Sequence, residues 1–377
     1  MQLQRVLTCC TGDASSAAER GGSPYFCSRA LTRQGVPSEG INLNPGRLSF
    51  YRSAWAAGRL LTGHHPLGFQ YSNTFTELIA RQWPSISLGD WVLSWHPFII
   101  PSFIVASERF SLYLDCSQKQ VFSHYSRSVR SSSLKQSALA REAHIFQNAH
   151  SIFCMSHWAA DSIRRDYEVE GKKVHVVPAG SNLDEDNLSS LHASSFPEAP
   201  SLQQPLRLGF LGKEWQRKGG PFLLELAEAL QQRGVPTVVR AIGPDPARLP
   251  SHPALQPLGF INKQTDTARF VAELRSWHFG TLFSEAEAFG ISNRECLRLG
   301  VPVLAHAVGG IASTLPDAGC GQLFPAEPSA VEVADWIHAR LNPYEGYIAW
   351  RDALAPRWRE FTWDAAVEQL AEILQSP

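Results

Sequence analysis

The chain has almost no net charge. Its 34 lysine and arginine residues are nearly balanced by 35 aspartate and glutamate residues, which leaves a formal net charge of −1 at pH 7. The basic residues are also dispersed along the sequence. Proteins that bind nucleic acids usually carry a basic patch, stripe or tail. We therefore expect no DNA or RNA partner.

Cysteine and histidine occur in no pattern that suits a disulfide framework or a metal site. The seven cysteines are odd in number, contain no C-x-x-C pair, and include adjacent Cys9 and Cys10 in the expected first strand. The histidines show no metal-ligand spacing with acidic partners. We expect no metal site and a protein of the reducing cytoplasm.

Apolar runs are too short to span a membrane. The first ten residues contain too little apolar sequence for a signal peptide. The most apolar stretch, Trp91–Ala106, is shorter than the roughly 20 residues that a spanning helix needs, and Pro97 and Pro101 interrupt it. We expect a buried strand and the loop beyond it. Exposed parts of that loop leave peripheral membrane contact open.

The length and composition suit two domains. A chain of 377 residues with 44% hydrophobic residues can form two cores of ordinary size. Both halves alternate short apolar runs with amphipathic segments, which predicts a doubly wound α/β architecture. Residues 189–204 are rich in serine and proline and lack periodicity, which predicts a linker. We expect domains at 1–188 and 205–360, and a C-terminal helix at about 361–377 that completes the first domain.

The most informative loop lies between an expected strand and an expected helix. The apolar run Trp277–Phe283 predicts the strand, and helix-compatible spacing predicts a helix that starts near Ser292. The first N–H groups of a helix lack intrahelical partners and carry partial positive charge, which favours a phosphate. We therefore expect the loop of Phe289, Gly290 and Ile291 to face a diphosphate.

Two glutamates, Glu287 and Glu295, bracket this loop. Glu295, in the first turn of the expected helix, could accept hydrogen bonds from a vicinal diol such as ribose, and Glu287 could reach a sugar. The alternative is that both are solvated charges beside a βα loop. The run Gly300–Ala305 favours the ligand interpretation, because a glycine helix stop followed by a buried strand completes a βαβ unit, and ligands bind beyond the carboxyl ends of such strands.

A second glycine-rich loop lies upstream. The apolar run from Leu206 leads into Gly212, and adjacent Arg217 and Lys218 follow. Arginine grips phosphate oxygens through its planar fork and lysine binds as a point charge, so the pair could neutralise a diphosphate leaving group. The alternative is a solvated basic turn before the amphipathic helix expected at 221–232.

These motifs together resemble the retaining, nucleotide-sugar-dependent glycosyltransferases of family 4, over nearly the whole chain. The resemblance implies the GT-B fold, in which two Rossmann-like domains face each other across a cleft. It rests on several segments: Phe153–Ala160, Val174–Gly180, Gly209–Gly212, Arg217–Gly219, Leu258–Phe260, Glu287–Glu295 as the family's E-x7-E motif, Gly300–Val303 and Val308–Gly310.

The resemblance also implies roles for these residues. Arg217 and Lys218 would bind the diphosphate, with Gly212 and the backbone of the 289–291 loop nearby. Glu295 would bind the ribose and Glu287 the hydroxyls of the donor sugar. The departing phosphate would act as the base, so neither a protein nucleophile, a metal nor a cofactor is implied.

In the N-terminal half, the resemblance implies three further positions. Gly21 and Gly22 precede an expected helix, where the family has a glycine loop near the donor phosphates; the alternative is a plain βα turn. His96 follows an expected strand, where the family often has a cleft-lining histidine; the alternative is a structural hydrogen bond. Asp115 matches an acceptor-side Asp-Ala-Thr of one branch, but Cys116–Ser117 departs from that pattern, and Asp115 could equally cap the next helix.

The expected function is transfer of a sugar from a nucleoside-diphosphate carrier to a hydroxyl acceptor, with retention of configuration. The acceptor could be a glycan, a lipid-linked molecule or a small molecule. The catalytic candidates are Lys218, Arg217, Glu287 and His96. Alternatives are a GT-B phosphorylase, a sugar-nucleotide epimerase, or an inactive regulator that binds nucleotide sugars; the intact set of charged residues argues against the inactive regulator. The sequence carries no signal for an oligomeric state.

Overall fold

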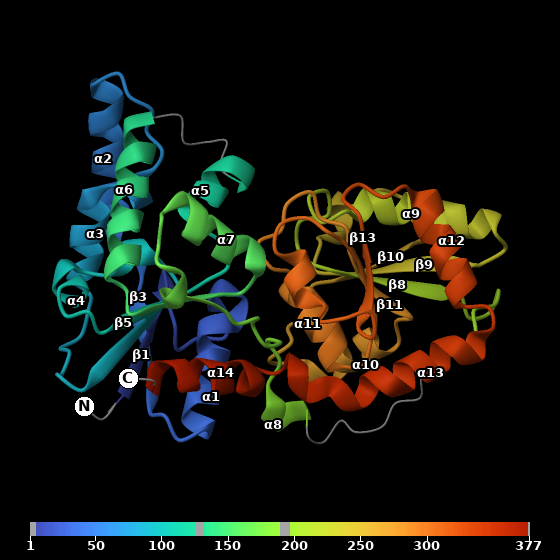
Figure 1. Cartoon of the computed structure of the whole chain (residues 1–377). Coiled ribbons are helices and arrows are strands. Elements are labelled where there is room, and N and C mark those ends of the chain that lie inside the picture. Colours follow the sequence, from blue (N-terminus) through green and yellow to red (C-terminus); the bar gives the residue numbers. More distant parts are fainter. Residues whose placement is uncertain (1–4, 126–131, 189–196, 376–377) are drawn as a thin grey trace. The chain divides into compact units, whose positions relative to one another are not determined.

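The chain divides into two compact units, each with its own sheet and core (Figure 1). A computed structural model describes residues 5–125, 132–188 and 197–375. Unit 1 comprises residues 1–178 and 366–377, and unit 2 comprises residues 179–365. Both units are Rossmann-like, with parallel strands separated by helices, so the predicted α/β fold class is confirmed.

In the described part of unit 1, seven strands form one sheet in the order β2-β3-β1-β4-β5-β6-β7. All neighbouring strands are parallel except β2 and β3. The strands are β1 (Arg5–Cys9), β2 (Gly12–Asp13), β3 (Ser38–Leu43), β4 (Asp90–Ser94), β5 (Phe110–Leu114), β6 (Ser151–Cys154) and β7 (Val174–Val176). The helices are α1 (Ser23–Arg33), α2 (Ser49–Leu61), α3 (Asn73–Ala80), α4 (Ser102–Val105), α5 (Gln118–Gln120), α6 (Ser132–Asn148), α7 (His157–Asp166) and α14 (Trp363–Gln375).

The central strands of unit 1 are covered on both faces. Every residue of β5 and β6 is buried, as expected for parallel strands between helical layers. Four helices contribute to one large apolar cluster, in which Phe75, Ile104, Phe146 and Ile163 join Leu112 of β5. None of the seven cysteines, all of which lie in described residues, forms a disulfide.

The apolar stretch Trp91–Ala106 forms most of strand β4 and the segment that leads to α4. Phe98 and Ile99 are buried after the strand, whereas Phe103 is 54% exposed. In the described parts of the chain, every helix is too short or too polar to cross a membrane.

In the described part of unit 2, six parallel strands are ordered β10-β9-β8-β11-β12-β13. The order reverses between β8 and β11, as in dinucleotide-binding sheets. The strands are β8 (Leu206–Leu211), β9 (Thr237–Ile242), β10 (Leu255–Gly259), β11 (Phe279–Leu282), β12 (Val303–His306) and β13 (Gly321–Phe324). The helices are α8 (Glu185–Leu188), α9 (Gly220–Gln232), α10 (Thr267–Arg275), α11 (Ile291–Arg298), α12 (Ala330–Arg340) and α13 (Tyr344–Leu354).

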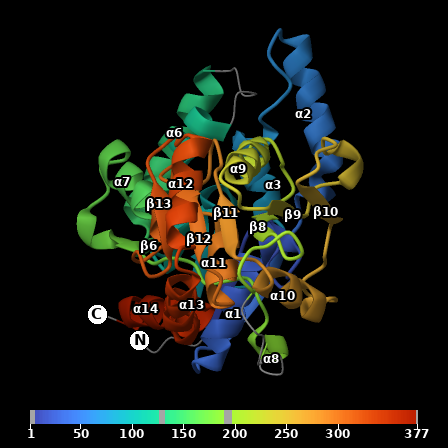
Figure 2. The same cartoon turned by 90° about the vertical axis from the view of Figure 1, so that its right-hand side faces the viewer.

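Two apolar clusters cover opposite faces of the unit 2 sheet. Helices α9 and α12 lie together over one face, where Leu226 packs with Leu304 of β12 (Figures 1 and 2). On the other face, Phe270 of α10 and Leu297 of α11 pack with Val303, the neighbour of Leu304. Successive strand residues point to opposite faces, so β12 serves both cores.

The division into units differs from the boundary expected after residue 188. Residues 179–188 belong to unit 2, because Leu183 and Leu188 join its core and Glu185 accepts a hydrogen bond of 3.0 Å from the Arg298 Nε. Within the expected linker, 189–196 lie outside the described residues. Just beyond them, the Pro197 carbonyl accepts a 2.6 Å hydrogen bond from the Tyr344 hydroxyl. Serine- and proline-rich composition therefore did not mark the boundary.

Helix α14 forms where a C-terminal helix is expected. Trp363 belongs to unit 2, where its indole Nε1 donates a 2.8 Å hydrogen bond to the Asn182 side chain. Residues from Ala366 onward belong to unit 1, and Val367 and Leu370 are buried.

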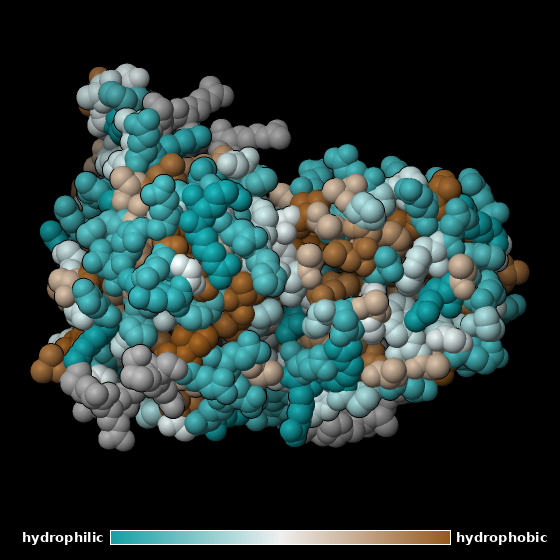
Figure 3. All heavy atoms as spheres, viewed as in Figure 1, coloured by the Kyte–Doolittle hydropathy of each residue, from teal (hydrophilic) through white to brown (hydrophobic). Residues whose placement is uncertain are grey.

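The surface of each unit is mostly hydrophilic on the face that Figure 3 shows, and apolar residues form scattered patches on it.

Candidate functional site

The charged loops singled out in the sequence follow adjacent strands of unit 2. Strand β8 leads into the loop at 212–219, β11 leads into the loop at 283–290, and the two strands pair directly. They lie on either side of the point where the strand order reverses. Parallel α/β sheets bind ligands beyond the carboxyl ends of their strands at this point.

Lys218 and Glu287 form the central ion pair of this site. The Lys218 Nζ lies 2.8 Å from the Glu287 Oε2, and the two side chains are 16% and 14% exposed. The Ser284 hydroxyl donates to the same carboxylate oxygen at 3.3 Å. Partial burial strengthens the attraction between the charges relative to a fully solvated pair. Sequence reasoning had named the lysine and the glutamate but not their direct contact.

Arg217 joins the two loops through its backbone and its side chain. Its carbonyl accepts a 2.8 Å hydrogen bond from the Glu285 N–H, and its Nη1 donates a 2.6 Å hydrogen bond to the Ala286 carbonyl. The same Nη1 lies 3.6 Å from the Glu287 Oε2. Glu214 accepts a 2.9 Å hydrogen bond from the Arg217 Nε, and this contact lowers the pKa of the Glu214 carboxyl. Two cations therefore face two carboxylates.

Close packing explains the glycines of these loops. A Cβ on Gly212 would lie 2.4 Å from the Lys218 Cδ, so only glycine leaves the lysine side chain its present path. Gly219 has φ +81°, and a Cβ there would lie 2.3 Å from the Phe283 carbonyl oxygen. A larger residue at either position would move the cations away from Glu287.

Helix α11 begins at Ile291, one residue earlier than expected. Gly290 precedes it with φ +96°. Glu295 is consequently the fifth residue of the helix, in its second turn, which corrects the first-turn placement. The side chain of Phe289 is only 3% exposed, so at this position the backbone alone can face a ligand. The N–H groups of the first turn remain the polar groups that the helix presents at this end.

The partner of Glu295, Lys263, was not among the residues expected at the site. Glu295 is 3% exposed, and its Oε1 forms an ion pair with the Lys263 Nζ. Lys263 lies in the loop after β10, 32 residues away in sequence, so no local spacing could reveal the pair. The only available signal was its place three residues after the Leu258–Phe260 segment.

Two candidates of unit 1, His96 and Asp115, follow carboxyl ends of parallel strands, whereas Gly22 comes after the short antiparallel strand β2. Gly22 has φ +98° and directly precedes α1, while His96 follows β4 with its ring 5.4 Å from that of Phe98. Asp115 follows β5 and is exposed. The N-cap of α5 is Ser117, whose hydroxyl accepts from the Gln120 N–H at 3.3 Å, so the alternative role of Asp115 as that cap is wrong.

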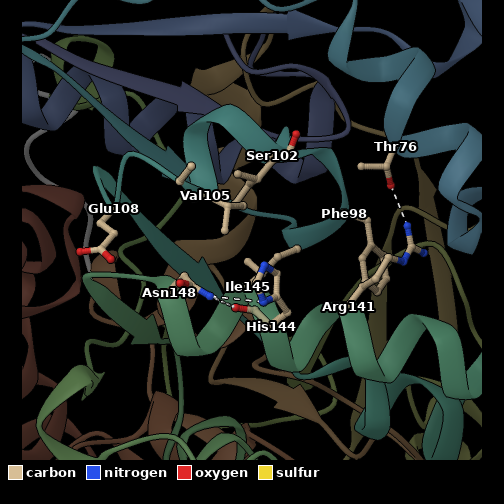
Figure 4. Close-up of a pocket in the computed structure, with 11 residues that line it drawn as sticks. Thr76, Phe98, Ser102, Val105, Glu108, Arg141, His144, Ile145 and Asn148 are labelled. Atoms are coloured by element: carbon tan, nitrogen blue, oxygen red, sulfur yellow. Dashed lines mark hydrogen bonds between the residues drawn. The ribbon is translucent and has the colours of Figure 1, made fainter.

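Unit 1 also contains a cavity of about 360 Å³ between α4 and α6 (Figure 4). None of the candidate site residues lines it, although five lining residues belong to the apolar stretch Trp91–Ala106. Arg141 donates a 2.8 Å hydrogen bond to the Thr76 hydroxyl, and Asn148 donates a 2.7 Å hydrogen bond to the His144 carbonyl. The lining residues are Thr76, Phe98, Ile100, Ser102, Val105, Ala106, Glu108, Arg141, His144, Ile145 and Asn148.

Comparison with curated proteins places the chain near glycosyltransferases. It is 24% identical over 239 residues to the alpha-D-kanosaminyltransferase of Streptomyces kanamyceticus, and this alignment covers 62% of each chain. The matched region is thus less than two thirds of that relative's length. No protein-family model matches the sequence.

Solved structures share the fold over almost the full chain. The sucrose-phosphate synthase of Thermosynechococcus elongatus has a TM-score of 0.63 at 15% identity, and the match covers 98% of both chains. HepE of Anabaena, solved in complex with UDP-glucose, has a TM-score of 0.58 at 17% identity and covers 99% of this chain and 100% of its own. The fold is that of the GT-B glycosyltransferases.

Proposed function

We propose that the chain is a retaining glycosyltransferase of the family 4 type, which transfers a sugar from a nucleoside-diphosphate carrier to a hydroxyl acceptor. The observation that carries the proposal is the cluster of Arg217, Lys218 and Glu287 beside the start of α11. Its components come from two loops that meet at the strand-order reversal of unit 2. The similarity to a kanosaminyltransferase and to a fold that binds UDP-glucose in HepE supports a nucleotide-sugar donor.

In this proposal, Arg217 and Lys218 bind the diphosphate. Both cations already contact Glu287, so a bound diphosphate would take up positive charge that a carboxylate now balances. As the bond to the sugar breaks, negative charge grows on the phosphate oxygens, and preorganised cations stabilise that charge. Because two protein cations supply this stabilisation, we propose that the reaction is metal-independent.

The remaining donor contacts come from α11 and its preceding loop. The backbone N–H groups of Gly290 and Ile291 would bind phosphate oxygens at the helix start. Glu295 would accept hydrogen bonds from the ribose hydroxyls while Lys263 holds one of its oxygens. Glu287 would bind hydroxyls of the donor sugar. Its ion pair with Lys218 weakens it as a nucleophile, which agrees with the departing phosphate as the base that accepts the acceptor's proton.

Three residues of unit 1 have supporting roles in the proposal. Gly22 offers backbone that a phosphate can approach closely, because it precedes α1 without a side chain. His96 and Asp115 would contact the sugar or the acceptor, since both follow strand ends of the unit 1 sheet. We further propose a cytoplasmic location, which suits a protein whose cysteines form no disulfide.

Calorimetric titration with UDP, GDP and ADP, with and without magnesium, tests the donor site. We expect one diphosphate to bind with a micromolar Kd in either condition. Glu295→Ala should weaken binding, whereas Lys218→Ala should mainly lower kcat with the matching nucleotide sugar. Absence of binding to all three nucleotides would contradict the donor site and favour the phosphorylase, whereas binding without sugar transfer would favour the inactive regulator.

A further inference from the structure

Helix α2 of unit 1 turns an apolar face toward solvent. None of its residues is buried, and Phe50 and Leu61 are 77% and 89% exposed. Phe50, Ala54, Ala57 and Leu61 are spaced four, three and four residues apart, so they share one face of the helix. Ala54 and Ala57 are exposed as well. This stripe therefore reverses the usual arrangement, in which a surface helix buries its apolar side.

The other side of α2 attaches the helix to unit 1. The Trp55 side chain packs against the unit 1 core, with its ring 5.8 Å from that of Phe69. Arg59 lies over the Trp55 ring, 5.3 Å from its centroid, and its Nε donates a 3.2 Å hydrogen bond to the His65 carbonyl. Because Trp55 fixes the helix by this side, the stripe of Phe50 and Leu61 has no core of unit 1 to pack against.

The segment that contains the stripe carries only positive formal charges in its sequence. Residues 40–76 contain no aspartate or glutamate but include Arg47, Arg52 and Arg59. This segment carries a formal charge of +3, whereas the whole chain carries −1. Arg47 and Arg52 are exposed, and within the described residues neither forms an ion pair with a carboxylate. A second copy of the same segment would be repelled by this charge, whereas an anionic surface would be attracted.

Further apolar side chains extend the stripe at both ends. Phe50 and Tyr51 are adjacent, with ring centroids 5.8 Å apart, at the start of the helix. Leu60 is 61% exposed beside Leu61, and Leu67 is 50% exposed beyond the helix end. Helices that lie in a lipid interface combine an exposed apolar face, aromatic side chains and flanking cations.

We propose that the segment from Arg47 to Leu67 docks unit 1 on the surface of an anionic lipid bilayer. The apolar stripe would enter the headgroup region, while the positive charge of the exposed Arg47 and Arg52 would attract the anionic lipids. This inference does not depend on the proposed glycosyl transfer. If that transfer also holds, docking would place the enzyme where lipid-linked hydroxyl acceptors are found.

Vesicle flotation of the full chain tests the docking surface. We compare vesicles of phosphatidylcholine alone with vesicles that contain phosphatidylglycerol as well. We expect binding to the anionic vesicles, weaker binding at high salt because screening reduces the attraction, and little binding to neutral ones. Leu61→Ser and Arg52→Glu should each lower the partition coefficient by about tenfold, through lost apolar burial and lost charge respectively.

Two exposed residues of unit 1 outside the segment supply matched controls. Leu88 is 83% exposed and Arg81 is exposed, so Leu88→Ser and Arg81→Glu repeat the same chemical changes elsewhere. Both controls should bind vesicles as the unchanged chain does. Equal binding to neutral vesicles, no binding to either kind, or an equal loss in the controls would overturn the proposal.

A self-association measurement and a nucleotide titration complete the test. A dimer that Leu61→Ser dissociates, without vesicle binding by the unchanged chain, would assign the stripe to a second copy and overturn lipid docking. All four variants should bind nucleoside diphosphate as the unchanged chain does, because the changes lie outside unit 2. If Leu61→Ser or Arg52→Glu loses lipid binding but keeps normal nucleotide binding, the change has removed the docking surface alone, which supports the proposal.

Discussion

At the scale of the residue, the ion pair of Lys263 and Glu295 holds two opposite charges together in the proposed donor site. We expect Lys263→Met to lower the free energy of unfolding by about 1–3 kcal/mol, because the Glu295 side chain, at 3% exposure, would lose its ion-pair partner. Urea denaturation measures this change. Nucleotide affinity should fall as well, since the carboxylate would lose its fixed position.

Lys263→Arg is the matched control for this pair. It keeps the positive charge and a hydrogen-bond donor, so it should retain most of the stability and most of the affinity. Lys263→Met with unchanged stability and unchanged affinity would contradict the positioning role.

A second residue-scale prediction concerns a buried carboxyl in unit 1. Glu142 accepts a 3.0 Å hydrogen bond from the Gln118 N–H and another from the Tyr167 hydroxyl. Burial raises the pKa of Glu142 to about 8. The folded chain therefore keeps a proton that the unfolded chain releases at lower pH, and the stability this group provides is lost as pH rises from about 5 to 8.

Urea denaturation between pH 5 and 8 measures this effect. Glu142→Gln should remove up to about 1.4 kcal/mol per pH unit of the decline in stability. The matched control is Glu77→Gln, at an exposed position of α3, which should keep the slope of the unchanged chain. Equal slopes for Glu142→Gln and the unchanged chain would contradict the prediction.

The charged residues of the proposed donor site were predictable from the sequence, but the ion pairs that they form were not. Arg217, Lys218 and Glu287 were identifiable because each follows an apolar strand and accompanies glycine, a local pattern. Lys263 and Ser284 were not, because a lysine or serine in a loop is ordinary and only the folded sheet brings them beside Glu295 and Glu287. Contacts between loops of different strands depend on strand order, which spacing within one loop does not encode.

At the scale of the element, the turn after β12 supports the loop at 283–290. The Gly310 N–H donates a 3.0 Å hydrogen bond to the Glu287 carbonyl. Gly309 has φ +57°, and a Cβ there would lie 2.0 Å from that carbonyl oxygen. We expect Gly309→Ala to cost about 2–4 kcal/mol and to weaken nucleotide binding, because the clash is with backbone and the loop must shift.

Gly234→Ala is the control that separates the effect of backbone strain from the effect of the clash at Gly309. Gly234 has φ +75°, but nothing lies within 4 Å of the added Cβ. It should cost only about 1 kcal/mol and leave nucleotide affinity unchanged. Calorimetry and thermal denaturation of both variants test this, and similar affinities for the two would remove the supporting role of the turn.

The positions of elements were predictable where periodicity or glycine marked them. The strand before Glu287 and the helix after Gly22 form close to the expected residues, because apolar runs and an early proline decide them locally. The start of α11 was missed by one residue. Gly290, with φ +96°, directly precedes the helix, which therefore begins at Ile291. Because of this earlier start, Glu295 lies in the second turn and not in the first.

At the scale of the whole molecule, each unit has its own core, so we expect a nucleotide to stabilise the two units to different extents. A nucleoside diphosphate at 100 times its Kd should stabilise unit 2 by about 2.7 kcal/mol. Unit 1 should gain less, so hydrogen exchange should slow chiefly around 212–219, 263 and 287–295. Protection confined to unit 1 would contradict the placement of the donor site. The division after residue 178 was not predictable from composition, because nothing in residues 179–188, which were expected in the first domain, shows that Leu183 and Leu188 join the core of unit 2.

The path of α14 has a consequence for synthesis on the ribosome. Unit 1 contains residues that precede unit 2 in the chain and also residues 366–375, which are made after all of unit 2. Nascent domains commonly fold in the order of their synthesis. In this chain, Val367 and Leu370 are buried residues of unit 1, and they are translated only after all of unit 2. Unit 1 can therefore complete its core only after unit 2 has been translated, and until then its N-terminal part lacks the residues of α14.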